Sequence, residues 1–195
     1  LQLYEYYRDV EDELSWLHDK LPVATSTDLG ASLTQAQNLL KKHTALESEI
    51  AAHEPLLAKV SQTAGKMSEQ GHYATKDVQR RLEDLNATAN QLRQAAEARR
   101  TRLLDAVESQ TFYSEVAEAE SWMSEKVPAL SSSELGKDED SVHLLQKKLK
   151  ALELDIDNFQ KTIRELGKLS QGLVKRGHFD SDNIQQQQQS IERKY

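Results

Sequence analysis

Two of the six histidines lie among apolar residues, and histidine is the side chain best suited to proton chemistry near neutral pH. His43 follows two lysines in the stretch LLKKHTALESEI, and His53 lies in AAHEPLL. A catalytic or metal-binding histidine needs a nucleophile, a carboxylate or a second histidine at a suitable spacing. A histidine on an apolar helix face is more often packed in a core, so the surrounding pattern has to decide between the two roles.

Other chemistry-bearing patterns are missing from the sequence. His72 and His178 each follow a glycine, in GHY and GHF, with no carboxylate or second histidine at ligand spacing, which favours a structural turn over a metal site. The chain has no cysteine, so thiolate zinc sites and thiol nucleophiles are excluded. No nucleophile and base pair and no glycine-rich phosphate loop occurs. We therefore predict that the chain is not an enzyme and has no cofactor, metal or catalytic residue.

The composition indicates long helices. Ala, Leu, Glu, Lys and Arg make up 90 of the 195 residues, whereas Gly contributes seven and Pro three. The formal charge of −7 is spread over interspersed acids and bases, which argues against nucleic acid as a partner. The densest basic cluster, Arg99, Arg100 and Arg102, is flanked by acids and is expected to form a solvated, paired helix face. The predicted fold class is all-α.

The sequence repeats itself at an offset of 106 residues. LLKKHTALESEI, residues 39–50, lies over LQKKLKALELDI, residues 145–156, with seven of twelve positions identical. The same offset pairs Trp16 with Trp122, Gly30 with Gly136, and GHY with GHF. Several widely separated matches at one spacing indicate two copies of one unit. The predicted domains are residues 1–105 and residues 106–195, the second being truncated at its C-terminus.

Apolar residues within each copy follow a 3-4 spacing, the heptad pattern of helices packed along a seam. In the second copy, Leu149 occupies the position of His43 and Phe159 that of His53. Both histidines thus stand where the other copy has a plain hydrophobe, and packing explains them without chemistry. The predicted structural core consists of Trp16, Leu17, His43, Leu46, Ile50, His53, Trp122, Met123, Leu149, Leu152, Ile156 and Phe159.

Each copy contains three such helical segments, and the third segment of the first copy leads into the first of the second. Between Gly71 and Pro128 stand 56 residues with neither Gly nor Pro, enough for a continuous helix of roughly 80 Å. The phase of the seam shifts near the junction, which we place at Leu103, Ala106 and Gln110. Ser32 is expected to cap the second segment, and Thr75 and Ser181 to cap the third by accepting from free backbone N–H groups.

These features together resemble spectrin repeats. The resemblance covers the whole chain and consists of the 106-residue period, the Trp in ELSWLHDK and AESWMSEK, the DLG or ELG loop, the LLKKH stretch, and GH before the third segment. It implies tandem left-handed three-helix coiled-coil bundles joined by a continuous helix. YYRDVEDELSWL with ATSTD is closer to the rod interior of a β-type spectrin chain, and the α-type chain is the open alternative.

The resemblance also implies a function. Spectrin repeats form an elastic rod of the membrane skeleton in the cytoplasm, at the inner face of the plasma membrane. The implied partners are an antiparallel spectrin chain and, through domains outside this sequence, actin. A docking role toward ankyrin or anionic lipid is the alternative to a spacer role. One long coiled-coil dimer is disfavoured, because Gly and Pro interrupt the heptads at matching places.

Two departures from the family pattern stand out. Ala89 and Tyr195 occupy the position where the third helix commonly carries a Trp. Pro55 falls inside the second helical segment, where it removes a backbone donor and is expected to kink or loosen the turn.

Overall fold

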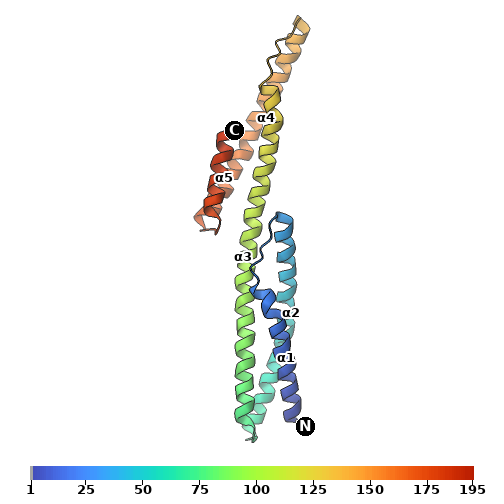
Figure 1. Cartoon of the computed structure of the whole chain (residues 1–195), viewed down its shortest axis with the longest axis vertical. Helices are drawn as coiled ribbons and strands as arrows, with labels where there is room; N and C mark the ends of the chain where they lie inside the picture. Colours follow the sequence, from blue (N-terminus) through green and yellow to red (C-terminus); the bar gives the residue numbers. More distant parts are fainter. Residues whose placement is uncertain (1) are drawn as a thin grey trace. The chain divides into compact units, whose positions relative to one another are not determined.

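The computed structural model describes residues 2–195, and this part of the chain is built of α-helices with no strand (Figure 1). The helices are α1 (Gln2–Thr25), α2 (Leu33–Glu69), α3 (Thr75–Leu130), α4 (Glu139–Lys175) and α5 (Ser181–Lys194). The all-α prediction is confirmed. The expected continuous helix is α3, whose 56 residues include the junction at Ala106.

Contacts divide the chain into a first unit that ends at Ala106 and a second unit from Val107 to Tyr195. The first unit contains α1, α2 and the first part of α3. The second contains the rest of α3 together with α4 and α5. The division therefore falls inside a helix and not in a linker.

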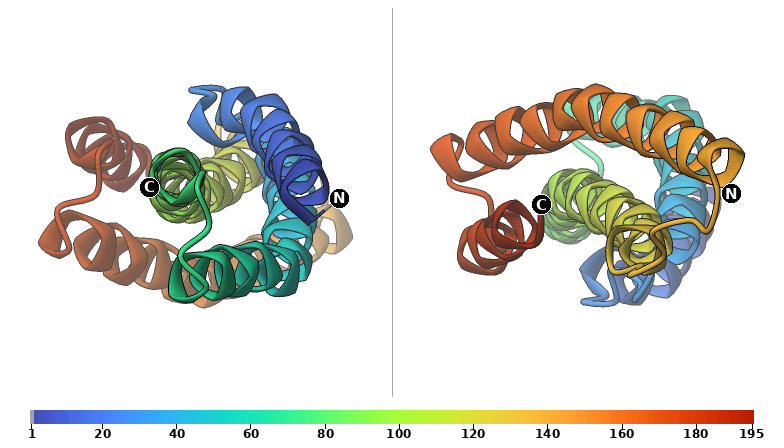
Figure 2. Two further views of the ribbon diagram at one scale, coloured as in Figure 1. Left: turned by 90° about the horizontal axis from the view of Figure 1, so that it is seen from below. Right: turned by 90° about the horizontal axis from the view of Figure 1, so that it is seen from above.

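In the first unit, three helical segments lie side by side around one core (Figure 2). Each segment turns a 3-4 stripe of apolar residues inward, as the heptad pattern requires. The fully buried residues include Tyr6, Val10 and Leu17 on α1, Leu46, Leu57, Val60, Ala64 and Met67 on α2, and Val78, Leu85, Ala89, Leu92 and Ala96 on α3.

The second unit has a smaller core, concentrated where α5 packs on α4. It is formed by Phe112, Val116, Ala119, Ile163, Leu166, Leu173, Ile184 and Ile191. α5 has 14 residues against 37 in α4, and the hydroxyl of its neighbour Tyr195 donates to the carbonyl oxygen of Ile156 at 2.8 Å. α5 therefore covers only the part of α4 that follows this residue.

This difference overturns one core assignment. Leu149 is 52% exposed, whereas Leu46, from the same stretch of the first unit, is 4% exposed. Leu149 precedes the part of α4 that α5 covers, so its side chain faces solvent. The prediction that Leu149 is a core residue is wrong for this structure.

Neither Pro22 nor Pro55 ends its helix. α1 continues past Pro22 to Thr25, and α2 is unbroken from Leu33 to Glu69 although it contains Pro55. A proline removes its own backbone donor and crowds the preceding turn, yet the apolar stripe of α2 continues beyond it with buried Leu57 and Val60. Tertiary packing on both sides of the proline stabilises the helix through this point.

Candidate functional site

His43 lies inside the core of the first unit, where it makes one interhelical hydrogen bond. Its side chain is 2% exposed, and its Nε2 lies 2.8 Å from the carbonyl oxygen of Ala96 on α3. Because a carbonyl can only accept, Nε2 carries the proton and donates. Nδ1 has no hydrogen-bond partner among the described residues, and the nearest carboxylate, Glu47, is 3.9 Å from Nε2. His43 joins α2 to α3 and has no nucleophile to activate.

His53 stacks on Trp16 and pairs with a buried carboxylate. The ring centroids of His53 and Trp16 are 3.5 Å apart and nearly parallel, at 11°. The His53 Nδ1 lies 2.7 Å from a carboxylate oxygen of Glu13, which is 8% exposed. This contact supplies the partner that a carboxylate buried on α1 requires.

The second unit has the same stack without the polar pair. Trp122 and Phe159 have ring centroids 3.8 Å apart at an interplanar angle of 10°. Ala119 stands where the first unit has Glu13. The acid and the histidine of the first unit are thus replaced together by two apolar residues, which is the pattern of a structural pair and not of a catalytic one.

The remaining predicted core and junction residues differ in burial. Leu17 is 2% exposed, Leu103 is 0% exposed and Ala106 is 3% exposed. The others are half-buried: Trp16, Ile50, Trp122, Met123, Leu152, Ile156, Phe159 and, at the junction, Gln110.

His72 and His178 each close a turn before a helix. Gly71 and Gly177 have φ values of +66° and +70°, in the left-handed region that glycine adopts without strain. The Nδ1 of His72 accepts from the backbone N–H of Ala74 at 3.2 Å, and that of His178 accepts from Asp180 at 3.0 Å. The histidine rings therefore satisfy backbone donors at these two helix starts.

The predicted caps at Thr75 and Ser181 are wrong. Their hydroxyls donate to the carbonyl oxygens of His72 and His178, both at 2.6 Å, and do not accept from backbone N–H groups. In each turn, the histidine ring already accepts from the nearby backbone N–H group. The hydroxyl therefore donates to the histidine carbonyl oxygen. Ser32 does accept from the backbone N–H of Gln35, at 3.3 Å, as predicted.

Arg99 is a structural residue that sequence reasoning missed. It is 4% exposed, and its guanidinium donates to the carbonyl oxygens of Ser26 and Asp28 in the connection between α1 and α2. Burial lowers its pKa, and the charge of Arg102 lowers it further. The expected solvated basic face is therefore wrong at this position. The signal was present, because Arg99 continues the 3-4 seam three residues after Ala96.

Tyrosines tie the start of the first helical segment to the third helix in each unit. The Tyr6 hydroxyl donates to the carbonyl oxygen of Val78 at 2.9 Å, and burial raises its pKa to about 12. The Tyr7 hydroxyl donates to Asp77 at 2.7 Å, which lowers the pKa of that carboxyl. In the second unit, Tyr113 donates to Asp180 at 2.5 Å, and burial raises the pKa of Tyr113.

Neither a metal site nor a membrane span is found in residues 2–195. No group of three or more metal-binding side chains converges in this part of the chain. None of its helices combines the length and the apolar character needed to cross a bilayer. The histidines and Arg99 described above take part in packing, helix ends and loop closure.

Comparison with known proteins finds one family. The family model described as the spectrin repeat matches residues 1–105 and 107–195. The chain is 35% identical to the human spectrin beta chain, non-erythrocytic 4, over 194 residues, and 36% identical to the Drosophila melanogaster spectrin beta chain over 183 residues. It is also 36% identical to the mouse spectrin alpha chain, erythrocytic 1, over 166 residues. The matches cover 100%, 94% and 85% of this chain, but only 8%, 8% and 7% of those relatives.

Proposed function

Because this chain belongs to the spectrin repeat family, a structural and non-enzymatic family, we propose that it is an elastic spacer of a spectrin-based membrane skeleton. In this role it links actin and membrane attachment sites that other parts of the protein provide. The proposal assigns one repeat to residues 1–105 and a second to residues 106–195. The family match and the division of contacts at Ala106 support these bounds.

The observation that carries the proposal is the unbroken helix α3. Its 56 residues supply the third segment of the first unit and the first segment of the second. Leu103 and Ala106, beside the division, are both buried. Under tension, unfolding of one unit has to fray a helix that the other unit packs against, so we expect the two units to resist unfolding together.

A proline in the middle of α3 tests this coupling. Ala106→Pro removes a backbone donor and clashes with the preceding turn, at a cost of about 3 kcal/mol or more. Two single-tryptophan variants report the units separately. Trp122→Phe keeps Trp16, which reports the first unit, and Trp16→Phe keeps Trp122, which reports the second. We expect coincident unfolding midpoints for the two reporters, and separated, lowered midpoints once Ala106→Pro is added.

Ala151→Pro is the matched control, because Ala151 is exposed in the middle of α4, a helix of one unit only. It should lower both midpoints together. Unchanged midpoints and cooperativity in Ala106→Pro would show that the units do not communicate through α3.

The spacer role includes a partner chain and a location. We propose that the full-length protein pairs with an antiparallel spectrin chain and lies in the cytoplasm at the inner face of the plasma membrane. The relatives named as spectrin alpha and beta chains support this assignment. The β type is the preferred assignment for this chain.

Docking of ankyrin or anionic lipid is the second candidate function. The supporting observation is the exposure of apolar side chains at the turns: Tyr73 is 89% exposed, Phe179 is 62% exposed and Leu135 is 85% exposed. Pulldowns with ankyrin and the complementary spectrin chain, and sedimentation with phosphatidylserine vesicles, test this function. Absence of binding in all three leaves the spacer role alone.

A further inference from the structure

A groove with an apolar floor runs between α3 and α4 in the second unit. Two adjoining hollows of about 370 and 320 Å³ share Trp122, Phe159 and Thr162. The stacked rings of Trp122 and Phe159 are half-buried, and buried Ala119 and Leu166 complete the floor of the larger hollow. We call this feature the second-unit groove.

The rim of the second-unit groove is acidic. Glu115 and Glu118 on α3 and Glu165 on α4 line the larger hollow, and all three are exposed. Neither glutamate of α3 has a cation within ion-pair distance among the described residues. Glu165 pairs with Lys161 on its own helix, at 4.0 Å, and exposed ion pairs of this kind contribute little to stability. Near the smaller hollow, Lys126 pairs with Asp155 at 2.9 Å.

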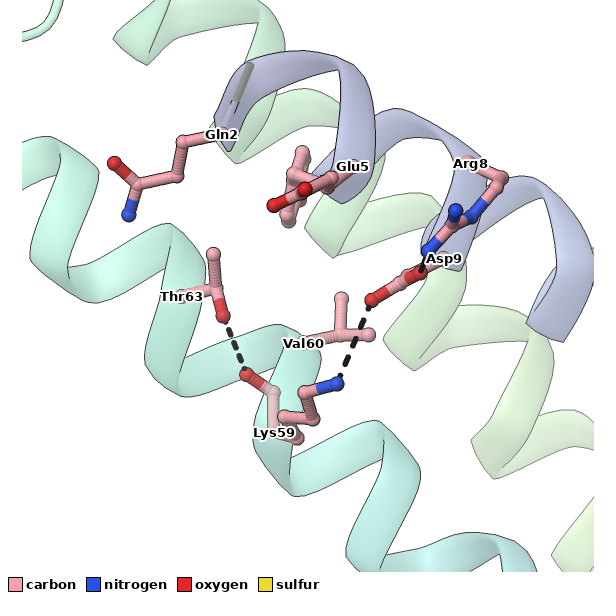
Figure 3. A pocket seen from close by; sticks show the side chains of 8 residues that line it. Gln2, Glu5, Arg8, Asp9, Lys59, Val60 and Thr63 are labelled. Carbon is pink, nitrogen blue, oxygen red and sulfur yellow. Dashed lines mark hydrogen bonds and ion pairs between the residues drawn. The ribbon is translucent and has the colours of Figure 1, made fainter.

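In the first unit, the positions of Glu115 and Glu165 carry an ion pair, which Figure 3 shows at the edge of a neighbouring hollow. There Lys59 occupies the position of Glu165 and lies 3.8 Å from Asp9, which occupies the position of Glu115. The floor is polar as well, because His53 replaces Phe159. The second unit has therefore exchanged an ion pair across the groove for two carboxylates and has made the floor apolar.

The third helical segment of a bundle does not fill this groove. In the first unit, α1 and α2 pack against α3 from Val78 to Ala96, yet Trp16 and His53 stay partly exposed. The counterparts of the rim residues Glu118 and Glu165, Asp12 and Lys59, are also exposed there, so α3 does not cover this surface in the first unit. In the second unit, the rim residues Glu118 and Glu165 are exposed in the same way, although the ring of Tyr195, directly after α5, lies 6.2 Å from that of Phe159.

We propose that the second-unit groove docks a basic amphipathic helix of a partner protein. The groove follows two antiparallel helices, and the ridge of a third helix packs into such a groove. Apolar side chains of the partner cover Trp122 and Phe159, and its Lys or Arg residues meet Glu115, Glu118 and Glu165. Charge complementarity selects a basic partner over an acidic one. The site requires only a folded α3 and α4 and is independent of the spacer role.

The test uses the intact chain with Trp16→Phe, so that Trp122 is the single tryptophan reporter. The probe is a blocked helical peptide of repeated Lys-Leu-Leu-Lys blocks, and the charge control is the same peptide with Glu for Lys. We expect a saturable, salt-sensitive change in Trp122 fluorescence with the basic peptide and none with the acidic one. Equal binding of both peptides, or no saturable change, would refute the proposal.

Glu165→Lys restores the cross-groove pair of the first unit and should weaken binding about tenfold, because an attraction becomes a repulsion. Glu118→Gln should also weaken binding of the basic peptide. Glu134→Lys makes the same charge change in the exposed connection before α4 and should leave the affinity nearly unchanged. Circular dichroism melts confirm that each variant is folded.

Two outcomes overturn the site. Equal weakening by Glu134→Lys and Glu165→Lys would mean that the peptide responds only to net charge. Binding that survives Glu165→Lys but is lost in Leu149→Lys would place the peptide on the exposed apolar part of α4 instead.

Discussion

At the scale of single residues, the two units show how one packing position accepts either a polar or an apolar pair. Glu13 and His53 in the first unit correspond to Ala119 and Phe159 in the second, and each aromatic ring stacks on the tryptophan of its unit. The acid and the histidine depend on each other, because a buried carboxylate without a partner is costly. A mixture in which Glu13 faces an apolar residue would leave the buried carboxylate without this partner.

The first prediction tests this dependence. His53→Phe alone should destabilise the chain by about 1–3 kcal/mol, because Glu13 loses its partner. Glu13→Ala with His53→Phe, which copies the second unit, should recover most of the loss. Urea unfolding followed by circular dichroism measures both. A double variant no more stable than His53→Phe would contradict the dependence.

The second prediction concerns the exposure difference between Leu46 and Leu149. Leu46→Ala should cost about 2–5 kcal/mol, because it opens a cavity in a packed core. Leu149→Ala should stay within about 0.5 kcal/mol of the parent, as surface substitutions do. Chemical denaturation of the two single variants gives the comparison. Similar losses would mean that Leu149 is buried in solution.

At the scale of helices, the ends are defined by specific side-chain contacts. Asp138 accepts from the backbone N–H of Ser141 at 2.8 Å and, as the N-cap of α4, shares a capping box with that serine. In the first unit, Arg99 donates to the connection between α1 and α2. His72 and His178 accept from backbone N–H groups just before α3 and α5. Each contact fixes where a helix begins or how the chain reaches it.

The third prediction follows from the N-cap of α4. The backbone and hydroxyl hydrogen bonds from Ser141 lower the pKa of Asp138. A lowered pKa in the folded state means that the stabilisation is present above the unfolded-state pKa and is lost as the pH falls through the folded-state pKa. Asp138→Ala should therefore lower the melting temperature at neutral pH, and the difference from the parent should shrink in acid.

Glu134→Ala, in the same connection, is the control and should leave the neutral-pH melting temperature nearly unchanged. A difference between Asp138→Ala and the parent that persists undiminished in strong acid would show that the carboxylate is not its cause.

At the scale of the whole molecule, the main property is that two packed units share the helix α3. Because one helix belongs to two cores, we expect unfolding of one core to destabilise the segment of the helix in the other. This shared helix supports the mechanical role that we propose. In the function that we propose, the repeats set the length of the spacer and resist unfolding together under tension.

The fourth prediction measures this coupling from the second unit. Leu166 is 2% exposed, and Leu166→Ala should cost about 2–5 kcal/mol. In the Trp122→Phe background, Trp16 reports only the first unit. We expect the Trp16 transition to shift to lower denaturant along with the circular dichroism signal. An unshifted Trp16 transition would show independent units.

The sequence by itself determined the helical class, the seams and the continuous helix, because these depend on hydrogen bonds and side-chain spacings within a few residues. It also contains the 106-residue repeat, which alignment of the chain with itself finds directly. It also led to the spectrin repeat family. Only the tertiary structure decided which seam positions are buried, because burial depends on a neighbouring helix. Leu46 and Leu149 occupy different settings for that reason. The same holds for Arg99, whose partners Ser26 and Asp28 lie 73 and 71 residues away and meet it only in the folded unit.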